Sequence, residues 1–445
     1  MKKHKSLLIK NGTVITLGKR NRVLENHSLL VEGDRITRIA PAAGFRGKYG
    51  AVLDARGKVV MPGLINAHMH FYSTLVRGLG KAKSSANFNE ILENLWWRLD
   101  RKLTQEDCYI SAAVSLIEAV KKGTTTLIDH HASPGAVRGS LDAIAQAVKD
   151  VGLRASLCYE VSDRDGEKVA REGLEENAVF IDRCRKEKDP QLSALFGLHA
   201  SFTVSDKTLR LAVEMAGARN TGFHVHTAEA TSDQEHSRKA FGKSVVERFH
   251  HFGVLGPQTI CAHCVHVDDR DIALLAESGT QVVHNPQSNM NNAVGIANVL
   301  AMMKKGIPVG LGTDAMTVNM FEEMRSALWA QKLRHNDPSA GFAEMLSTLA
   351  FNNAGIADRL FTPGLGQLKE GGPADIILID YFPPTPLNSD TFLGHLCFGL
   401  AQSTVDTTIA SGKILMLNKE LKIGLDEAKV AAKASKLARK LWARF

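Results

Sequence analysis

Long apolar runs are missing from this sequence of 445 residues. No stretch approaches a membrane-spanning length without meeting charged residues, so we expect no transmembrane helix and no membrane partner. The basic start, residues 1–5, is typical of a signal peptide. However, Lys10, Asn11 and Gly12 interrupt the apolar part, and no small-residue cleavage site follows. We therefore expect a cytoplasmic protein.

Cysteines are also few. Six are scattered through a chain that is long enough to bury a large core, which argues against a disulfide-stabilised scaffold. No nucleic-acid motif accompanies the formal charge of +8, whose visible clusters are residues 2–5 and 433–440. The second cluster is spaced like the solvated face of a last helix. We expect no nucleic-acid partner.

What the chain does have is histidines, and one aspartate, at the ends of short apolar runs. The run that begins at Val60 stops at His68-x-His70. Side chains two residues apart on a strand share a face, so both imidazoles can bind one ion. Three further runs end at His224-Val225-His226, Ala262-His263 and Thr313-Asp314.

From residue 59 onward, strand candidates alternate with amphipathic helices. Thr104, Ser205 and Asp268 are N-caps of predicted helices that run to about residues 122, 218 and 277. Eight strand–helix units are what a closed (β/α)₈ TIM barrel needs, and its active site lies at the C-terminal strand ends. The suspected ligands end the first, fifth, sixth and eighth of these strands. The eight candidates are residues 59–70, 124–131, 154–161, 192–200, 222–229, 258–266, 279–286 and 308–314.

Both chain ends predict β-structure of another kind. Residues 6–58 contain short apolar pieces separated by turns, and residues 375–379 and 407–417 contain two more. A terminal helix is expected from about residue 424. The α/β fold that we predict is therefore a barrel of residues 59–365 beside a small composite β-sandwich domain of residues 1–58 and 366–445.

Three imidazoles and a carboxylate suit one divalent metal per chain, either zinc or iron(II). His226 is nearer than His224 to the end of its strand, so we predict His226 as the ligand and His224 as a deeper group. His263 ends its strand in the same manner, and Asp314 is a hard ligand that can also orient a water. The predicted metal ligands are His68, His70, His226, His263 and Asp314.

Glu229 follows His226 by three positions. Beside a metal it would shuttle a proton from the attacking water to a leaving nitrogen, whereas alone it would be an exposed loop carboxylate. His284 ends the seventh strand, where it either polarises the attacked carbon or holds the water. The predicted catalytic residues are Glu229, His263, His284 and Asp314.

Substrate contacts are expected from the barrel mouth and from the long insertion after the first strand. His131 and His199 end two strands at the same mouth, and each is either a substrate contact or a structural hydrogen-bonding group. The insertion carries Trp96-Trp97-Arg98, where a barrel usually builds its lid. One tryptophan is expected to pack inward, and the other, with Arg77 or Arg98, to hold a planar substrate. The predicted contacts are Trp96, Arg98, His131 and His199.

Five motifs together resemble the amidohydrolase superfamily: PGLINAHMH (62–70), HTAE (226–229), AHCVH (262–266), HNPQSN (284–289) and GTD (312–314). Their order is similar to the branch of mononuclear aminohydrolases that contains guanine, adenosine-type and chlorotriazine deaminases. Four segments are more closely similar to SsnA-type aminohydrolases: NLWWRLDR (94–101), DHHASP (129–134), SNMNN (288–292) and MFEEM (320–324).

The resemblance implies hydrolytic deamination of a heterocyclic or amidine-like C–N bond, a small-molecule substrate and a homodimer. It implies that His68, His70, His226 and Asp314 hold the metal while His263, His284 and Glu229 surround the water. In some members of the family His263 is a ligand, and in others it contacts the substrate. The stretch after Asp314 lacks the Asn-rich run of many nucleoside-type deaminases, which argues against a nucleoside.

We therefore predict a metal-dependent aminohydrolase that acts on C–N bonds other than peptide bonds. One alternative is chloride displacement by the same mononuclear site. A two-metal cyclic amidohydrolase is disfavoured, because the fourth strand ends at His199-Ala200 without the lysine that such a site needs. The second alternative is a non-catalytic scaffold, although every expected ligand position is filled.

Overall fold

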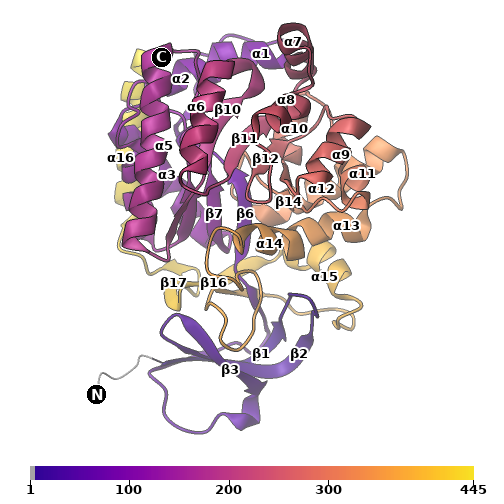
Figure 1. The fold of residues 1–445 in the computed structure, drawn as a ribbon. Helices are drawn as coiled ribbons and strands as arrows, with labels where there is room; N and C mark the ends of the chain where they lie inside the picture. The colour runs from indigo at the N-terminus through magenta and orange to yellow at the C-terminus, as the bar shows by residue number, and fades with distance from the viewer. Residues whose placement is uncertain (1–5) are drawn as a thin grey trace.

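A computed structural model describes residues 6–445, so the basic cluster at residues 2–5 lies outside the described residues (Figure 1). A mixed sheet at one end of the molecule contains β1 Ser6–Ile15, β2 Val23–Glu32, β3 Arg35–Pro41, β4 Ala51–Asp54, β5 Lys58–Pro62, β15 Ile376–Asp380, β16 Thr404–Ala410, β17 Lys413–Leu417 and β18 Glu420–Leu421. The strand order is β18-β17-β16-β15-β5-β1-β2-β3, with β4 paired to β1. Both chain ends thus contribute to one sheet, as predicted.

The larger body holds the parallel strands β6 Leu64–Met69, β7 Thr124–Asp129, β8 Arg154–Leu157, β9 Leu192–Ala194, β10 Phe196–Ala200, β11 Phe223–Thr227, β12 Ile260–His263, β13 Gln281–His284 and β14 Val309–Leu311. Hydrogen bonds join them into two sheets, β6 to β9 and β10 to β14. Isolated bridges between Met69 and Asp314, and between Val161 and Leu198, link the two sheets. Every predicted strand is present but shorter, and the fourth is divided at Leu195.

The first predicted strand, residues 59–70, is two strands. β5 belongs to the mixed sheet and β6 to the parallel strands, and the chain changes sheets at Gly63. The Gly63 amide donates to Asp375 O at 3.0 Å, whereas the Leu64 amide donates to Gly123 O at 2.9 Å. A Cβ at Gly63 would lie 2.3 Å from Thr125 Oγ1, so only glycine fits. An apolar run by itself does not show this change of partner.

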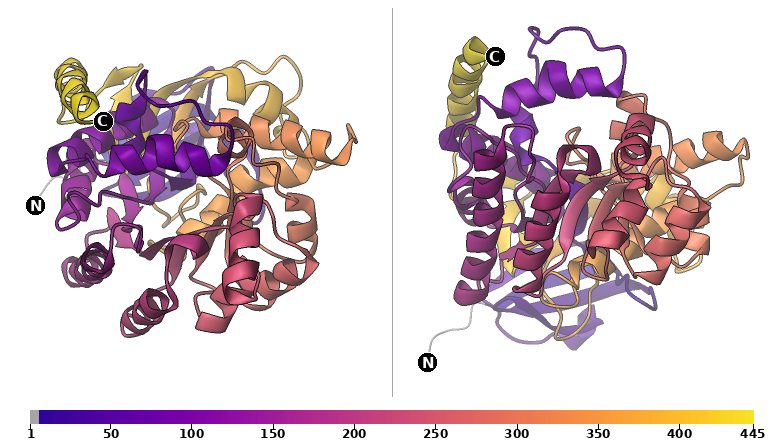
Figure 2. Two further views of the ribbon diagram at one scale, coloured as in Figure 1. Left: turned by 90° about the horizontal axis from the view of Figure 1, so that it is seen from above. Right: turned by 45° about the horizontal axis from the view of Figure 1, so that its top comes forward.

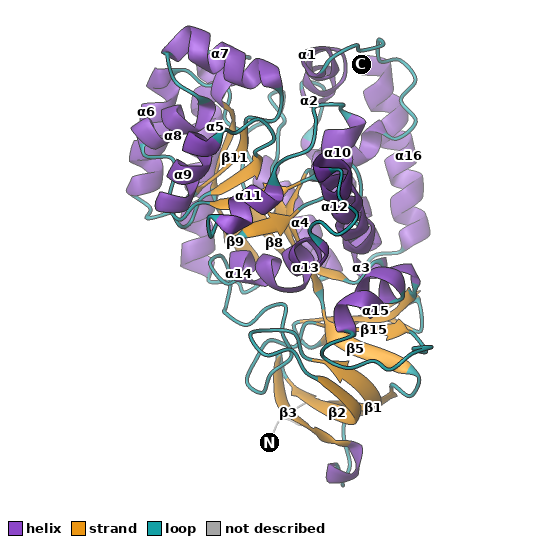
Figure 3. Cartoon of the chain, turned by 90° about the vertical axis from the view of Figure 1, so that its right-hand side faces the viewer, coloured by secondary structure: helices purple, strands orange, loops and turns teal. Residues whose placement is uncertain are grey.

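Helices surround the parallel strands, as the view from above in Figure 2 and the side view in Figure 3 show. The three predicted N-caps are confirmed, since Thr104, Ser205 and Asp268 each accept hydrogen bonds from the first turn of their helices. None of the helices in residues 6–445 is long and apolar enough to cross a membrane. The helices are α1 Phe88–Ile91, α2 Trp97–Asp100, α3 Gln105–Lys121, α4 Ser140–Val151, α5 Glu167–Glu187, α6 Asp206–Gly217, α7 Thr231–Phe241, α8 Val245–Phe252, α9 Asp269–Glu277, α10 Pro286–Asn291, α11 Val299–Lys304, α12 Met320–His335, α13 Phe342–Ser347, α14 Asn353–Ala357, α15 Phe392–Phe398 and α16 Glu427–Arg444.

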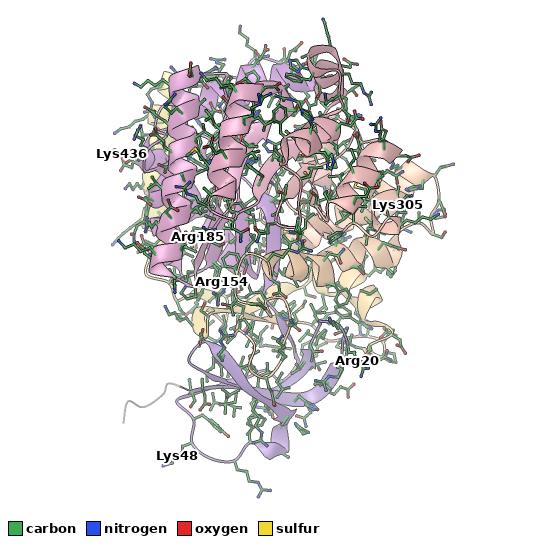
Figure 4. All side chains as sticks on the ribbon, viewed as in Figure 1. Arg20, Lys48, Arg154, Arg185, Lys305 and Lys436 are labelled. Carbon is green, nitrogen blue, oxygen red and sulfur yellow. The ribbon has the colours of Figure 1, made fainter. Side chains whose placement is uncertain are left out.

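A buried ion pair fixes the parallel strands to the mixed sheet. Arg154 at the start of β8 donates through Nε to Asp375 Oδ2 at 3.1 Å, and Figure 4 labels Arg154 where the two parts meet. The side chains are only 5% and 2% exposed. Asp375 Oδ1 also accepts from the Ser411 amide at 2.7 Å, so the carboxylate is well satisfied. The ion pair therefore fixes the mixed sheet at the N-terminal end of β8, on the side of the parallel strands opposite their C-terminal ends.

Candidate active site

Four of the predicted ligands meet at the C-terminal ends of the parallel strands. His68 lies in β6, His70 directly after it, His226 in β11, and Asp314 shortly after β14. Asp314 Oδ1 lies 2.9 Å from His70 Nε2 and 3.6 Å from His68 Nε2, and His226 Nε2 lies 3.2 Å from His70 Nε2. Ligands about 2.1 Å from one tetrahedral zinc ion are roughly 3.4 Å apart, so these spacings fit a single ion.

His263 approaches the same centre from β12. Its Nε2 lies 3.5 Å from Glu229 Oε2 and 3.9 Å from Asp314 Oδ2. His68, His226, His263 and Asp314 each offer a donor atom within 4.8 Å of the others. His68 Nε2 and His263 Nε2 are buried and have no hydrogen-bond partner among the described residues, which a metal ion would explain. The position of His263 between two carboxylates is compatible with both predicted roles.

Unusual backbone conformations direct His263 and Asp314 toward the other ligands. His263 and Asp314 have left-handed φ angles of 74° and 52°, which non-glycine residues adopt rarely and mainly where the surrounding structure imposes them. Gly312 lets β14 approach β6, because a Cβ there would lie 2.7 Å from His68 O. The Asp314 amide then donates to that carbonyl at 3.0 Å. The ends of the first and last parallel strands are therefore locked together.

His224 lies behind the centre, as its deeper place in the strand predicts. Its Nε2 is 2.8 Å from His68 Nδ1, so it holds the ring of His68 with Nε2 facing the other ligands. Burial lowers the pKa values of His68 and His226, the latter well below 6.5. Both rings are therefore neutral near pH 7, which is the form that binds a metal.

The two carboxyl groups beside the histidines have opposite pKa shifts. Burial, with the charge of Asp314 as a second cause, raises the pKa of Glu229 well above its ordinary value. Burial also opposes ionisation of Asp314, but its contacts with His68 and His70 outweigh this and hold its pKa well below the usual range. Asp314 is thus held as a carboxylate, whereas the environment of Glu229 favours its protonated form more than water does.

A pocket opens directly above these residues. Its inner wall includes His70, His199, His226, Glu229 and Asp314. Its outer wall comes from residues 88–100, which we call the lid segment. This segment contains a π-helical turn, Leu92–Trp96, between α1 and α2, a geometry that is frequent at functional sites. The lid residues in the pocket wall are Phe88, Ile91, Leu92, Leu95, Trp96, Trp97 and Asp100.

The structure places the predicted substrate contacts in different environments. Trp96 and His199 line the pocket, and so does Trp97. Arg98 instead donates through Nη2 to Phe445 O at 2.7 Å and lies outside the pocket wall. His131 is buried below the pocket, where its Nε2 is 2.9 Å from Ser133 Oγ. Its environment corresponds to the structural alternative.

His284 lies deeper than the pocket wall. It ends β13, it is fully buried, and it is not part of the pocket wall. Neither ring nitrogen has a hydrogen-bond partner in the described part of the chain. Burial lowers the pKa of His284 to about 3, so the ring is neutral.

Several pocket residues have no counterpart in the sequence prediction. Glu160, after β8, lies 3.2 Å from His70 Nδ1. Asp100 and Asp233 line the pocket, and the Asp233 carboxylate accepts from the Glu229 amide at 2.9 Å. Ser288 Oγ donates to Asp314 Oδ2. Ser288 lies in a motif that the sequence analysis identified, so its place near the site could have been predicted. Glu160 and Asp100 are not spaced like metal ligands, so no sequence pattern identifies them.

Comparison with known proteins agrees with this geometry. The model of the amidohydrolase family matches residues 59–415. The chain is 34% identical to a 5-methylthioadenosine/S-adenosylhomocysteine deaminase of Thermoanaerobacter pseudethanolicus, over 98% of this chain and 99% of that protein. It is equally similar, with the same coverage, to a 5'-deoxyadenosine deaminase of Methanosarcina mazei. A zinc-bound adenosine deaminase from Xanthomonas campestris has the same fold, with a TM-score of 0.85, 25% identity and 98% of both chains covered.

The chain belongs to the amidohydrolase family. This confirms the predicted enzyme class, a hydrolase that acts on carbon–nitrogen bonds other than peptide bonds. The buried histidine-rich site confirms the expectation of a metal-binding protein, and the Xanthomonas enzyme was crystallised with zinc. The activities named for the relatives agree with the predicted hydrolytic deamination.

Proposed function

We propose that this chain is a zinc-dependent deaminase of adenine-containing nucleosides, of the mononuclear aminohydrolase type. The main support is that His68, His70, His226 and Asp314 lie close together beside Glu229. In addition, the chain is similar to nucleoside deaminases along almost its whole length. The short stretch after Asp314 argued against a nucleoside. It contributes only Ala315 and Met316 to the pocket wall, so we give the full-length similarity more weight.

In this proposal His68, His70, His226 and Asp314 would hold the metal. When bound, the ion would lower the pKa of a water toward neutrality and would serve as a Lewis acid. Iron(II) would suit the same donors. Asp314 stays ionised at every working pH because its pKa is depressed, so it also orients the water's hydrogen atoms.

Glu229 carries the proton. Its carboxylate accepts a proton from the attacking water and donates it to the leaving amino nitrogen, so the products are a carbonyl compound and ammonia. The raised pKa makes the Glu229 carboxylate a stronger proton acceptor for the first half of this transfer. His263 Nε2, 3.5 Å from Glu229 Oε2, faces the same space and contacts either the ion or the substrate ring.

The pocket wall suits a planar base with a polar substituent. The lid segment offers Trp96, Trp97 and Phe88 for contact with an aromatic ring. Asp100 Oδ1 is buried at the pocket without a partner among the described residues. A sugar hydroxyl would satisfy it, since a carboxylate oxygen accepts such a bond.

The proposal is tested by ammonia release from zinc-analysed protein. The panel contains 5'-methylthioadenosine, S-adenosylhomocysteine, 5'-deoxyadenosine, adenosine, guanine and a chlorotriazine. We expect ammonia from one or more adenine nucleosides, about one zinc per chain, and loss of activity after chelation. Chloride release without ammonia would favour the dechlorinase alternative, and a folded, metal-free protein would favour the scaffold.

We further propose how the chain is organised. The parallel strands close into a (β/α)₈ barrel, and the mixed sheet forms a composite domain with its boundary at Gly63, where the chain changes sheets. The protein is proposed to be a cytoplasmic homodimer. Light scattering of the purified protein would test the dimer, since a mass of one chain of 48.4 kDa would contradict it.

A further inference from the structure

Glu160 lies between the metal ligands and the pocket. It follows β8, and its amide donates to His131 O at 2.7 Å, which fixes the backbone. Its side chain is 2% exposed and forms part of the pocket wall. The proposed proton transfer does not use it, so its burial there needs another explanation.

Three imidazoles surround this carboxylate. Glu160 Oε1 lies 3.2 Å from His70 Nδ1 and 3.6 Å from His130 Nδ1, and Oε2 lies 3.8 Å from His199 Nε2. Within residues 6–445 these histidines are its only ion-pair partners within 4.0 Å, and Oε1 has no hydrogen bond of good geometry. A buried carboxylate without a cation is costly, so positive charge must be supplied nearby.

A metal ion held by the opposite nitrogen of His70 would supply such charge, in addition to the charge of Arg164 that already acts on Glu160. The Nε2 of His70 faces Asp314 and His226, at 2.9 and 3.2 Å, so this nitrogen points to the metal centre. The opposite nitrogen, Nδ1, points to His130 O at 2.5 Å and to Glu160 Oε1. An acceptor and an anion behind a ligand ring fix its tautomer and make its other nitrogen a stronger ligand.

We propose that Glu160 is a positioning residue for the metal ligand His70. Its negative charge strengthens the bond from His70 to the ion, and the ion in turn compensates the buried carboxylate. The inference rests on the proposed metal centre but on no particular substrate. It adds a carboxylate from the third parallel strand to a centre whose ligands come from the first, fifth and eighth.

A second cation is the competing explanation. His70, His130, Glu160 and His226 each have a donor atom within 4.8 Å of the others. However, His70 Nε2 and His226 Nε2 already face the first centre, and an imidazole nitrogen has one lone pair for one ion. The other nitrogen of His70, Nδ1, carries the hydrogen of its bond to His130 O and so has no lone pair for a metal. Only His130 and Glu160 remain, which is fewer than the ligands of a protein zinc site. One ion per chain is therefore expected.

The test measures zinc affinity by competition with a chromogenic chelator. Glu160→Gln keeps the shape and removes the charge, and we expect zinc binding to weaken by about 10–100-fold. Glu160→Asp keeps the charge at a greater distance and should weaken binding less. Glu176→Gln is the matched control, because Glu176 is a buried carboxylate that accepts from the Gly139 and Leu141 amides, away from the metal centre. It should bind zinc like the wild type.

Wild-type zinc affinity in a folded Glu160→Gln protein would overturn the inference. So would two zinc ions in the wild type and one in this variant, because Glu160 would then be a ligand. If Glu160→Gln does not fold, Glu160→Asp alone decides, since unchanged affinity there contradicts the proposal. A wild type that binds no zinc would instead contradict the proposed function, so the two failures are distinguishable.

Discussion

At the metal end of the pocket the side chains come from strands spread between His68 and Asp314, whereas the outer wall comes from the lid segment, residues 88–100. The metal end is cross-linked by strand hydrogen bonds, by imidazole contacts and by the paired backbones of His68 and Asp314. From this difference we expect the strand ends to determine the chemistry and the lid to determine which substrate fits.

The last residues of the described chain contact the lid segment and the residues on either side of it. Trp442 Nε1 donates to Leu75 O at 2.8 Å, and Arg98 donates to Phe445 O while its guanidinium lies 4.1 Å from the Phe445 ring centroid. Arg444 donates to Lys102 O at 2.9 Å. The right-hand view of Figure 2 shows the C-terminus beside the lid helices. Of these contacts, the one between Arg98 and Phe445 reaches the lid segment itself, while Leu75 and Lys102 lie on either side of it.

The largest expected effect concerns the metal end. Glu229→Gln removes the proton carrier without removing a strand contact, so we expect kcat to fall by about 10²–10⁴-fold. Zinc content should stay at the wild-type level, because Glu229 is not one of the proposed ligands. Steady-state kinetics with metal analysis of the same sample checks this. A variant with near-normal turnover would remove Glu229 from the mechanism.

A smaller effect is expected in stability. Burial raises the pKa of Asp233 from 3.8 to about 7. A carboxyl group whose pKa is higher in the folded state adds stability that is complete below the unfolded pKa and is lost as pH rises through about 7. Asp233→Asn should therefore gain stability relative to the wild type between pH 5 and pH 8, by on the order of 1–2 kcal/mol.

Urea denaturation of the metal-free proteins at both pH values measures this difference. The direction in which the difference in the free energy of unfolding changes with pH tests the prediction. A wild type that gains stability relative to Asp233→Asn as pH rises would mean that the hydrogen bonds from the Glu229 and Ala230 amides outweigh burial.

The smallest effect concerns helix α16, whose last residues lie beside the lid segment and contact it through Phe445 and Arg98. Trp442→Phe keeps the ring and removes the hydrogen bond to Leu75 O, whose net contribution is about 1 kcal/mol. We expect KM to rise by about 3–10-fold with kcat changed less than about twofold. Arg439→Ala on the same helix is the control, because Arg439 contacts Ser435 Oγ and not the lid. If kcat falls while KM is unchanged, the result would contradict the expectation that the lid affects substrate binding and the metal end affects the chemistry.

Two regular patterns in the sequence account for the meeting of His68, His70, His226 and Asp314. A strand places alternate residues on one face, which identifies His68 and His70, and parallel strands end at one edge, which brings His226 and Asp314 to them. Glu160 follows a strand of four residues and has no ligand-like companion in sequence. Its role depends on histidines that only the folded chain brings close, so no local pattern reveals it.

Arg98 lies outside the pocket wall for a related reason. Its neighbours Trp96 and Trp97 line the pocket, at the place where the insertion was expected to lie. The side chain of Arg98, however, is occupied by Phe445, which is distant in sequence. Gly63 is the same kind of case, because its change of sheet depends on Asp375.

The sheet order has a consequence for how the protein is made. Strand β5 lies between β1 and β15, and Met61 pairs with Ile377. At about 5–20 residues per second, a ribosome needs roughly 15–60 s to reach β15 after β5 has been synthesised. During that time the apolar edge of β5 has no partner strand, which makes it a site for chaperone binding or for aggregation. The nascent N-terminal strands must wait for nearly the whole enzyme before their sheet is complete.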